Sequence, residues 1–346
     1  MKTEFVKIND LALCSDGIQR AASIIKSGGL VVIPTETVYG LGGDGTNAHS
    51  AEKIYAAKGR PSDNPLIIHI CEPSDADKYA YTNDTYYKLA KSFMPGPLTV
   101  VLKKKDIIPS TVTGGLETVA VRCPSHPVAR EIIRASGVPI AAPSANISGR
   151  PSPTCAEHVI ADLDGKVDMI VDGGECDIGL ESTIVMINDD GSLTLLRPGG
   201  ITYDALCCVC ENVNISPSIE GVLSENEHPL SPGMKYKHYA PLSPLILLDG
   251  DRDKVLNFLI DRQSKEKVLV LCYDDEVESL SGCTLLPIGE RGDIAGHAKR
   301  LFSALRESDK YSPDVIYAHM PDKCGLGMAL YNRMIRAAAH TVKYID

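Results

Sequence analysis

Short apolar runs alternate with helical patterns along the first two hundred residues of the chain. The clearest run covers residues 30–33, and Pro34 ends it because proline has no N–H to donate to a neighbouring strand. Before this run, apolar residues between 18 and 25 recur at the spacing of one helix face. After it, a helical pattern near residues 50–58 stops at Gly59, a usual residue for a helix end.

Further apolar runs predict additional strands in this part of the chain, with helical patterns between only some of them. The predicted strands are 66–70, 98–102, 118–122, 138–142, 168–171, 183–187 and 193–196. Because each crossover of a purely parallel sheet normally contains a helix, this pattern favours a twisted mixed sheet with flanking helices. We expect this α/β domain to cover residues 1–210.

The periodic pattern disappears between residues 211 and 244, where proline, serine and glutamate are frequent. This range is predicted to be a linker. Beyond it, predicted strands at 245–248, 268–273, 285–288 and 315–319 alternate with predicted helices at 254–262, 294–306 and 328–339. Such alternation is typical of a parallel, Rossmann-like α/β domain, which we expect over residues 245–346.

The composition excludes several classes of protein. A chain of 346 residues with 44% hydrophobic content can bury the cores of two globular domains. The net charge of -10 and the lack of long apolar stretches argue against general nucleic-acid binding and against a membrane protein. Eleven cysteines without regular spacing, and no signal-peptide pattern, predict free thiols and a cytoplasmic location.

Polar side chains occur where several of the predicted strands and one predicted helix end. They are Thr35, Lys58, Arg60, Arg122, Ser144, Asn146, Ser182 and Arg197. Any one of them alone could be a solvated charge or part of an ordinary turn. Because five strand ends share this feature, we expect them to meet in one cleft. Its cations and hydroxyls suit a polyanion such as a nucleoside triphosphate.

Known backbone motifs for nucleotide phosphates do not fit this chain. Gly40, Gly42 and Gly45 spell GxGxxG, but residues 34–39 separate them from the preceding strand, so we reject a dinucleotide fingerprint. We interpret these glycines as a flexible loop. Since the sequence also has no GxxxxGK[ST] motif, side chains are expected to carry most of the contacts to a nucleotide.

Residues 231–241 (SPGMKYKHYAP) concentrate lysine, histidine and tyrosine within the otherwise acidic linker. One interpretation is a solubilising tether. The other is a lid that folds over the cleft and excludes water from a reactive intermediate.

Several motifs resemble the threonylcarbamoyl-AMP synthases, the YrdC-like family in its long, two-domain form. They are PTETVYGLGGD, KGRP with NPL, PGPLT, VAVRCPSHP, PSANISG, LESTIV, RPGG and SPGMKYKHYAP, in this order. GLGMALYNRMIRAA near the C-terminus is similar to the second domain of that family. The resemblance implies a YrdC-like twisted sheet followed by a smaller Rossmann-like domain.

The resemblance also implies a reaction. L-Threonine, bicarbonate or CO2, and ATP would give threonylcarbamoyl-AMP and pyrophosphate, the first step of threonylcarbamoyladenosine modification of tRNA. The enzyme would then be a nucleotidyltransferase that passes its product to a tRNA threonylcarbamoyl-transfer complex, with weak tRNA contact and no membrane partner. ATP would be a substrate, and its Mg2+ would be held by ATP and not by protein side chains.

The resemblance assigns site residues by matching positions. The catalytic residues would be Lys58, Arg60, Ser144 and Asn146. ATP would be bound by Lys58, Ser62, Thr118, Ser144, Ser152, Arg197 and Tyr236. Threonine would be bound by Thr35, His69, Arg122, Ser182 and the backbone of Ala142.

Two other functions were weighed. An RNA-binding or ribosome-assembly module would need a local basic groove, and the absence of Trp and the presence of only four Phe weigh against base stacking. A carbamoyl-transfer enzyme of hydrogenase maturation shares the YrdC-like fold but should carry zinc-binding CxxC pairs. This chain has one such spacing, Cys207 to Cys210, without a second pair at zinc-ribbon distance.

Overall fold

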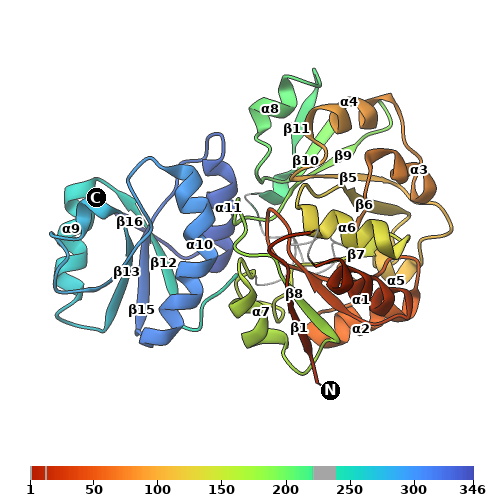
Figure 1. Cartoon of the computed structure of the whole chain (residues 1–346). Helices are drawn as coiled ribbons and strands as arrows, with labels where there is room; N and C mark the ends of the chain where they lie inside the picture. Colours follow the sequence, from red (N-terminus) through yellow and green to blue (C-terminus); the bar gives the residue numbers. More distant parts are fainter. Residues whose placement is uncertain (1, 12–13, 220, 222–238) are drawn as a thin grey trace. The chain divides into compact units, whose positions relative to one another are not determined.

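The structure is a computed structural model that describes residues 2–11, 14–219, 221 and 239–346 (Figure 1). The described residues form two compact units. The first lies within residues 1–148 and 152–235, and the second within 149–151 and 236–346. The domain limits at residues 210 and 244 stay predictions. Tyr236 and residues 231–238 of the predicted lid lie outside the described part of the chain.

The first unit contains an 11-stranded mixed sheet among its described residues, in the order β1-β8-β2-β3-β7-β4-β6-β5-β9-β10-β11. The strands are β1 (Glu4–Lys7), β2 (Val31–Ile33), β3 (Gly40–Asp44), β4 (Ile67–His69), β5 (Leu98–Lys103), β6 (Thr118–Arg122), β7 (Ile140–Ala141), β8 (Met169–Asp172), β9 (Thr183–Ile187), β10 (Leu193–Arg197) and β11 (Val213–Ile215). The sheet contains both parallel pairs, such as β4 with β6, and antiparallel pairs, such as β5 with β6. The mixed sheet predicted from the sequence is confirmed. Its last strand, β11, lies within the range predicted as a linker.

Helices and short 3₁₀ turns connect these strands. They are α1 (Ser15–Lys26), α2 (Ala48–Lys58), η1 (Pro73–Asp75), α3 (Ala76–Tyr79), α4 (Asp84–Phe93), α5 (Ser110–Thr113), α6 (Pro127–Ser136), α7 (Ala156–Leu163), α8 (Tyr203–Cys207) and η2 (Pro217–Ile219). Helices α1 and α6 pack together on one face of the sheet, where Ile25 and Ile132 bury apolar surface against Ile33 and Ile140 (Figure 1). His69 on β4 lies opposite Ile140 on β7, so the site described below is on the same face of the sheet as this packing.

The glycine-rich segment after Pro34 is a strand, and its interpretation as a flexible loop was wrong. Strand β3 pairs antiparallel with β2, with Gly42 opposite Val31. A Cβ atom at Gly42 would lie 2.7 Å from the Ile140 side chain and 3.0 Å from the Val31 carbonyl oxygen. Glycine is required here because neighbouring strands approach closely, and not because the backbone is loose.

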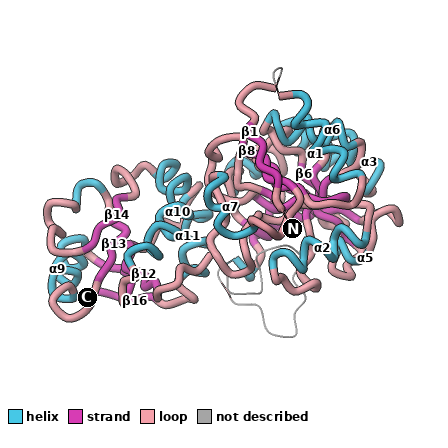
Figure 2. The backbone as a smooth tube through the Cα atoms, turned by 60° about the horizontal axis from the view of Figure 1, so that its bottom comes forward, coloured by secondary structure: helices cyan, strands magenta, loops and turns pink. Residues whose placement is uncertain are grey.

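The second unit contains a five-stranded sheet in the order β14-β13-β15-β12-β16, and every pair in it is parallel. Its elements are β12 (Leu245–Gly250), α9 (Arg252–Arg262), β13 (Val268–Cys272), η3 (Asp274–Glu276), β14 (Thr284–Pro287), α10 (Ile294–Ser308), η4 (Asp309–Tyr311), β15 (Val315–His319), α11 (Gly327–Ala337) and β16 (Val342–Ile345). Helix α9 covers one face, and α10 and α11 cover the other (Figures 1 and 2). The predicted parallel α/β unit is confirmed. No helix within the described ranges is long and apolar enough to cross a bilayer.

Candidate functional site

The register of the central strands places three polar side chains side by side. His69 on β4 lies opposite Arg122 on β6, and Arg122 lies opposite Thr99 on β5. Residues in register point to the same face of a sheet, and residues two positions earlier or later share that face. On this face lie the apolar residues Ile67, Val101, Ala120, Ile184 and Leu196, which form one buried cluster. His69, Arg122 and Thr99, called the polar row below, therefore lie beside this apolar cluster.

Arg122 forms a buried ion pair with Glu36. Arg122 Nη2 lies 2.8 Å from Glu36 Oε1, and both side chains are almost fully buried. Burial alone would raise the pKa of Glu36, but the Arg122 guanidinium outweighs it and the pKa is lowered. Glu36 thus stays ionised beside Arg122. The sequence assignment included Thr35 and missed Glu36, although Glu36 stands at the same strand exit.

Four buried ring or guanidinium nitrogens around this pair have no hydrogen-bond partner among the described residues. They are His69 Nδ1, His126 Nδ1, Arg122 Nε and Arg122 Nη2, and the last of these lies in the ion pair with Glu36. A buried polar atom without a partner costs about 1–3 kcal/mol, so such a group in a native fold is a candidate for ligand contact. Arg122 offers a donor for a carboxylate, and a neutral imidazole can bind a hydroxyl. His126 was not singled out from the sequence, where it follows VAVRCPS.

Burial lowers the pKa of His69 to about 3, and the charge on Arg122 acts in the same direction. The folded protein therefore keeps His69 neutral while the unfolded chain protonates it near pH 6.5. The unfolded state then binds more protons, so stability must fall as the pH decreases below this value.

We expect His69→Gln to reduce this loss of stability between pH 6.5 and pH 4.5. The difference between wild type and variant in the slope of unfolding free energy against pH should approach one proton, or about 1.4 kcal/mol for each pH unit. Urea unfolding at several pH values measures it. Parallel curves for the wild type and the variant would contradict the buried neutral state.

Ser182 connects the polar row to Arg197. The hydroxyl groups of Ser182 and Thr99 lie 2.8 Å apart. Arg197 donates from Nε to the Ser182 carbonyl at 3.0 Å and from Nη2 to the Ser182 hydroxyl at 3.1 Å. Arg197 is buried, so a second guanidinium is fixed near the end of β10. Thr99, Ser182 and Arg197 therefore form one hydrogen-bonded group, and Thr99 is in register with Arg122 on the neighbouring strand.

Thr35 lies directly beside Glu36 and is also buried. Its hydroxyl donates to the Val38 carbonyl at 2.6 Å and lies 2.9 Å from the Thr37 hydroxyl. Proline ends the preceding strand and this small hydrogen-bonded turn holds Thr35 and Glu36 in place. Thr37 is a further hydroxyl that the sequence assignment did not include.

Lys58, Ser144 and Asn146 are brought together at the end of helix α2. The helix ends at Gly59, whose φ of 60° is left-handed. Lys58 Nζ donates to the carbonyl oxygens of Ser144 and Asn146, at 2.5 Å each. The Ser144 hydroxyl donates to Asn146 Oδ1 at 2.6 Å. A buried ammonium thus stands inside the turn that follows β7.

Three further assigned residues are Arg60, Ser62 and Ala142. Arg60 donates to the carbonyl oxygens of Asn64 and Pro65. Ser62 is exposed in the turn that follows. Ala142 is buried and its N–H donates to the Ile67 carbonyl at 2.9 Å.

Thr118 and Ser152 occupy two further places in the first unit. Thr118 begins β6, on the same face as Arg122 but at the other end of the strand, and lines a cavity of about 540 Å³ with Lys103 and Met186. Ser152 is buried, and its hydroxyl donates to Glu181 Oε1 at 2.5 Å. Glu181 is another residue that the sequence assignment did not contain.

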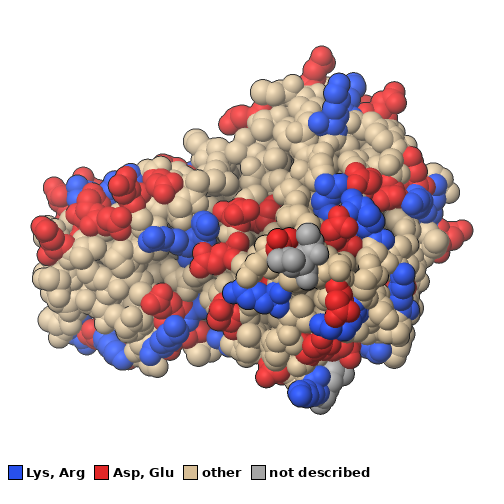
Figure 3. All heavy atoms as spheres, viewed as in Figure 1, with Lys and Arg blue, Asp and Glu red and all other residues tan. Residues whose placement is uncertain are grey.

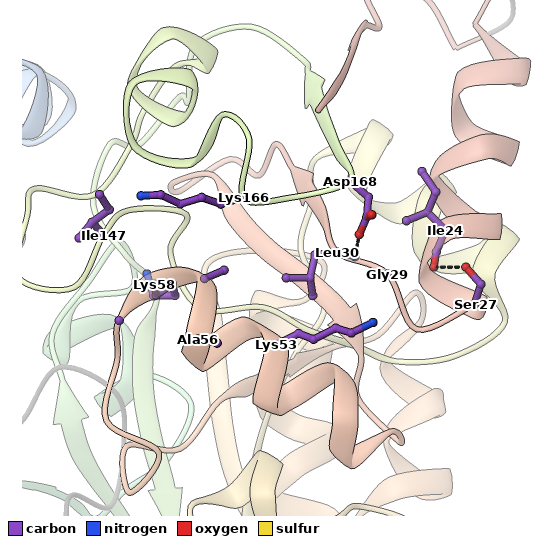
Figure 4. Close-up of a pocket in the computed structure, with 12 residues that line it drawn as sticks. Ile24, Ser27, Gly29, Leu30, Lys53, Ala56, Lys58, Ile147, Lys166 and Asp168 are labelled. Carbon is purple, nitrogen blue, oxygen red and sulfur yellow. Dashed lines mark hydrogen bonds between the residues drawn. The ribbon is translucent and has the colours of Figure 1, made fainter. Parts of the chain in front are cut away.

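A cavity of about 730 Å³ borders Lys58 on another side (Figure 4). Lys53 and Lys166 line it, but Lys53 donates to the Gly28 carbonyl and Lys166 to the Asp162 carbonyl. Asp168 accepts the N–H of Leu30 at 2.7 Å. Lys53, Lys166 and Asp168 are thus hydrogen-bonded to backbone atoms nearby, and neither Arg122 nor His69 lines the cavity. We therefore do not assign a substrate to it.

The buried guanidinium groups and the neutral imidazole adjoin an apolar cluster on one mixed sheet. Together they give an α/β protein with a candidate site whose donors suit a small anion. Within the described ranges no group of three or more His, Cys, Asp or Glu side chains gathers in a way that could hold a metal ion.

Comparison with known proteins identifies the family. A family model described as "Telomere recombination" matches residues 23–199, and a model described as "Threonylcarbamoyl-AMP synthase, C-terminal domain" matches residues 201–339. The chain is 43% identical to the threonylcarbamoyl-AMP synthase of Bacillus subtilis strain 168, over 99% of both chains. It is also 43% identical to that of Pyrococcus abyssi, over 94% of this chain and 95% of the relative. The chain belongs to the threonylcarbamoyl-AMP synthase family.

A solved structure agrees with this membership along the whole chain. The structure of Pyrococcus abyssi Sua5 in complex with L-threonine matches with a TM-score of 0.90 and 39% sequence identity, and the match covers all of both chains.

Proposed function

We infer that this protein is an L-threonylcarbamoyladenylate synthase, a nucleotidyltransferase. It converts L-threonine, bicarbonate or CO2, and ATP into threonylcarbamoyl-AMP and pyrophosphate. The observation that carries this inference is the buried row of His69 and Arg122, with unpartnered nitrogens, in a chain 43% identical to such enzymes over 99% of its length.

Threonine is proposed to bind at the polar row. The guanidinium of Arg122 is placed to bind the α-carboxylate, which would replace or share its contact with Glu36. His69, Thr35 and Ser182 are proposed to bind the hydroxyl or the amine, and the backbone of Ala142 would complete the contact. The Pyrococcus abyssi relative that was solved with L-threonine supports this choice of substrate.

The reaction needs two bond-forming steps. The neutral amine of threonine attacks CO2, forms the N–C bond and loses a proton, which gives a carbamate. A carbamate oxygen then attacks the α-phosphorus of ATP, and the bond to the pyrophosphate leaving group breaks. No covalent enzyme intermediate is required, because positioning of the reactants alone can contribute about 7–11 kcal/mol.

Lys58, Arg60 and Arg197 are proposed to neutralise the triphosphate. Negative charge increases on the phosphoryl oxygens and on departing pyrophosphate, and fixed cations in a buried site stabilise it most. Ser144, Asn146, Ser62 and Ser152 would donate further hydrogen bonds. Thr118 would bind the nucleotide at the opposite end of β6, and Tyr236, outside the described residues, would complete the ATP side.

Mg2+ is proposed to arrive bound to ATP. It prefers phosphate and water oxygens in octahedral geometry, and the described residues supply no carboxylate or imidazole cluster that could replace them. When bound, Mg2+ would neutralise part of the triphosphate charge. The protein residues named above would then orient the nucleotide.

The product is a mixed anhydride that water hydrolyses readily. It must therefore be used soon after release, and we propose that it passes to a tRNA threonylcarbamoyl-transfer complex in the cytoplasm. We propose that any direct contact with tRNA is weak. On the described part of the face seen in Figure 3, acidic and basic side chains are interspersed, which does not favour an RNA-binding module.

The test is incubation of the full chain with labelled bicarbonate, threonine and ATP, followed by mass detection of the adenylate. We expect labelled threonylcarbamoyl-AMP and pyrophosphate in equal amounts, and neither when threonine is omitted. Absence of the adenylate, together with salt-dependent binding of tRNA without ATP or threonine, would instead support the RNA-binding alternative.

A further inference from the structure

Three residues of the loop that follows β7, Gly149–Pro151, belong to the second unit. The chain leaves the first unit after Ser148, joins the second at Gly149–Pro151, and returns to the first at Ser152. Within the second unit the Ala240 N–H donates to the Gly149 carbonyl at 3.0 Å. The segment lies only a few residues after Ser144 and Asn146, the turn that surrounds Lys58.

Helix α10 holds this segment through Arg306. The side chain is buried, and it donates to the Pro151 carbonyl oxygen from Nε at 3.1 Å and from Nη2 at 2.6 Å. Two donors from one rigid guanidinium fix the direction of the peptide as well as its position. Just beyond the helix, Asp309 forms a second attachment, because it lies 3.0 Å from Arg150 Nη2 and accepts the Leu242 N–H at 2.8 Å.

The segment is stiff, so a constraint on it reaches its neighbours. Pro151 and Pro153 have fixed φ angles, and the residues before them, Arg150 and Ser152, are restricted to extended conformations. On one side the Ser148 N–H donates to the Lys58 carbonyl at 2.9 Å. On the other side the Ser152 hydroxyl is bonded to Glu181. A fixed Pro151 carbonyl therefore sets where Ser152 can lie.

We propose that Arg306 is a positioning residue for the adenylation reaction and that Asp309 assists it. Because Arg306 fixes the Pro151 carbonyl, it limits where Ser152, the next residue of the chain and one proposed to bind ATP, can lie. This role rests on the proposed function, because it assigns the loop to ATP.

The experiment measures kcat and KM for ATP and for threonine with the full chain and four variants. We expect Arg306→Ala to raise the KM for ATP about tenfold, since a small displacement of a positioning group has a large effect on rate. Arg306→Lys keeps a donor and should recover part of this loss. Asp309→Asn keeps an acceptor for Leu242 but loses the charge, and should raise the KM for ATP about two- to fivefold. Arg300→Ala, exposed on the same helix, is the control and should change neither constant.

The readouts separate positioning from folding and from the function itself. The KM for threonine should stay within about twofold of the wild-type value in every variant, since changes away from a binding site have small effects. Equal increases in both KM values, or unchanged constants in folded Arg306→Ala and Asp309→Asn, would overturn the inference. If Arg306→Ala does not fold, Arg306→Lys and Asp309→Asn decide the question. A wild-type chain that releases no pyrophosphate would overturn the proposed function instead.

Discussion

Replacing Lys58 by alanine is expected to reduce threonine-dependent pyrophosphate release about 10²- to 10³-fold, the cost of removing one fixed group that stabilises transition-state charge. Lys58 is buried at the end of α2, and its Nζ holds the Ser144 and Asn146 carbonyl oxygens. The substitution removes the ammonium from the site of charge increase and also loosens this turn. Steady-state assays at saturating ATP and threonine measure the effect.

Lys53→Ala provides a matched control on the same helix. Lys53 Nζ donates to the Gly28 carbonyl, away from the 144–146 turn, and its loss should leave turnover near the wild-type rate. Circular dichroism must show that both variants retain the native fold. A folded Lys58→Ala protein with normal turnover would remove Lys58 from the proposed mechanism.

Arg122→Gln is expected to weaken threonine binding and to destabilise the protein. Loss of a charged hydrogen-bond donor to the carboxylate should raise the KM for threonine about 10- to 100-fold. The variant also leaves Glu36 as a buried charge without its partner, and breaking a buried pair in this way costs about 3–5 kcal/mol. Threonine titration and urea unfolding measure the two effects separately.

A second substitution distinguishes these effects. In Arg122→Gln/Glu36→Gln the buried carboxylate is gone, so stability should largely return while threonine binding should not. Arg130→Gln is the control, since Arg130 pairs with Glu72 in a more exposed place. Recovery of threonine binding in the double variant would show that Arg122 does not bind the carboxylate.

The sequence predicted the elements well because apolar runs and helix ends are local signals. The run at residues 30–33 and the stop at Gly59 correspond to β2 and to the end of α2. The glycines of β3 were misread, because the need for glycine at residue 42 comes from Ile140, a residue of a strand far along the chain. Composition alone cannot separate a flexible glycine from one that a close neighbour requires.

The site was only partly predictable, since its residues meet through strand register. The exits of the strands indicated Thr35, Arg122 and Ser144, but the pairing of Arg122 with Glu36 depends on packing between distant segments. His126 and Glu181 were missed although His126 precedes the proline that begins α6 and Glu181 stands beside Ser182, because their contacts come from packing between distant segments. Ser62 was assigned by resemblance, and the structure leaves it exposed in a turn.

The attachment of Gly149–Pro151 also affects the order in which the chain can fold during synthesis. The ribosome makes Pro151 long before its partner Arg306, which follows 155 residues later. A nascent chain that has emerged only as far as β11 must therefore leave this short stretch untethered. We expect proteases to cut stalled nascent chains near Arg150 and to spare the finished protein there, and equal resistance in both would contradict this order of events.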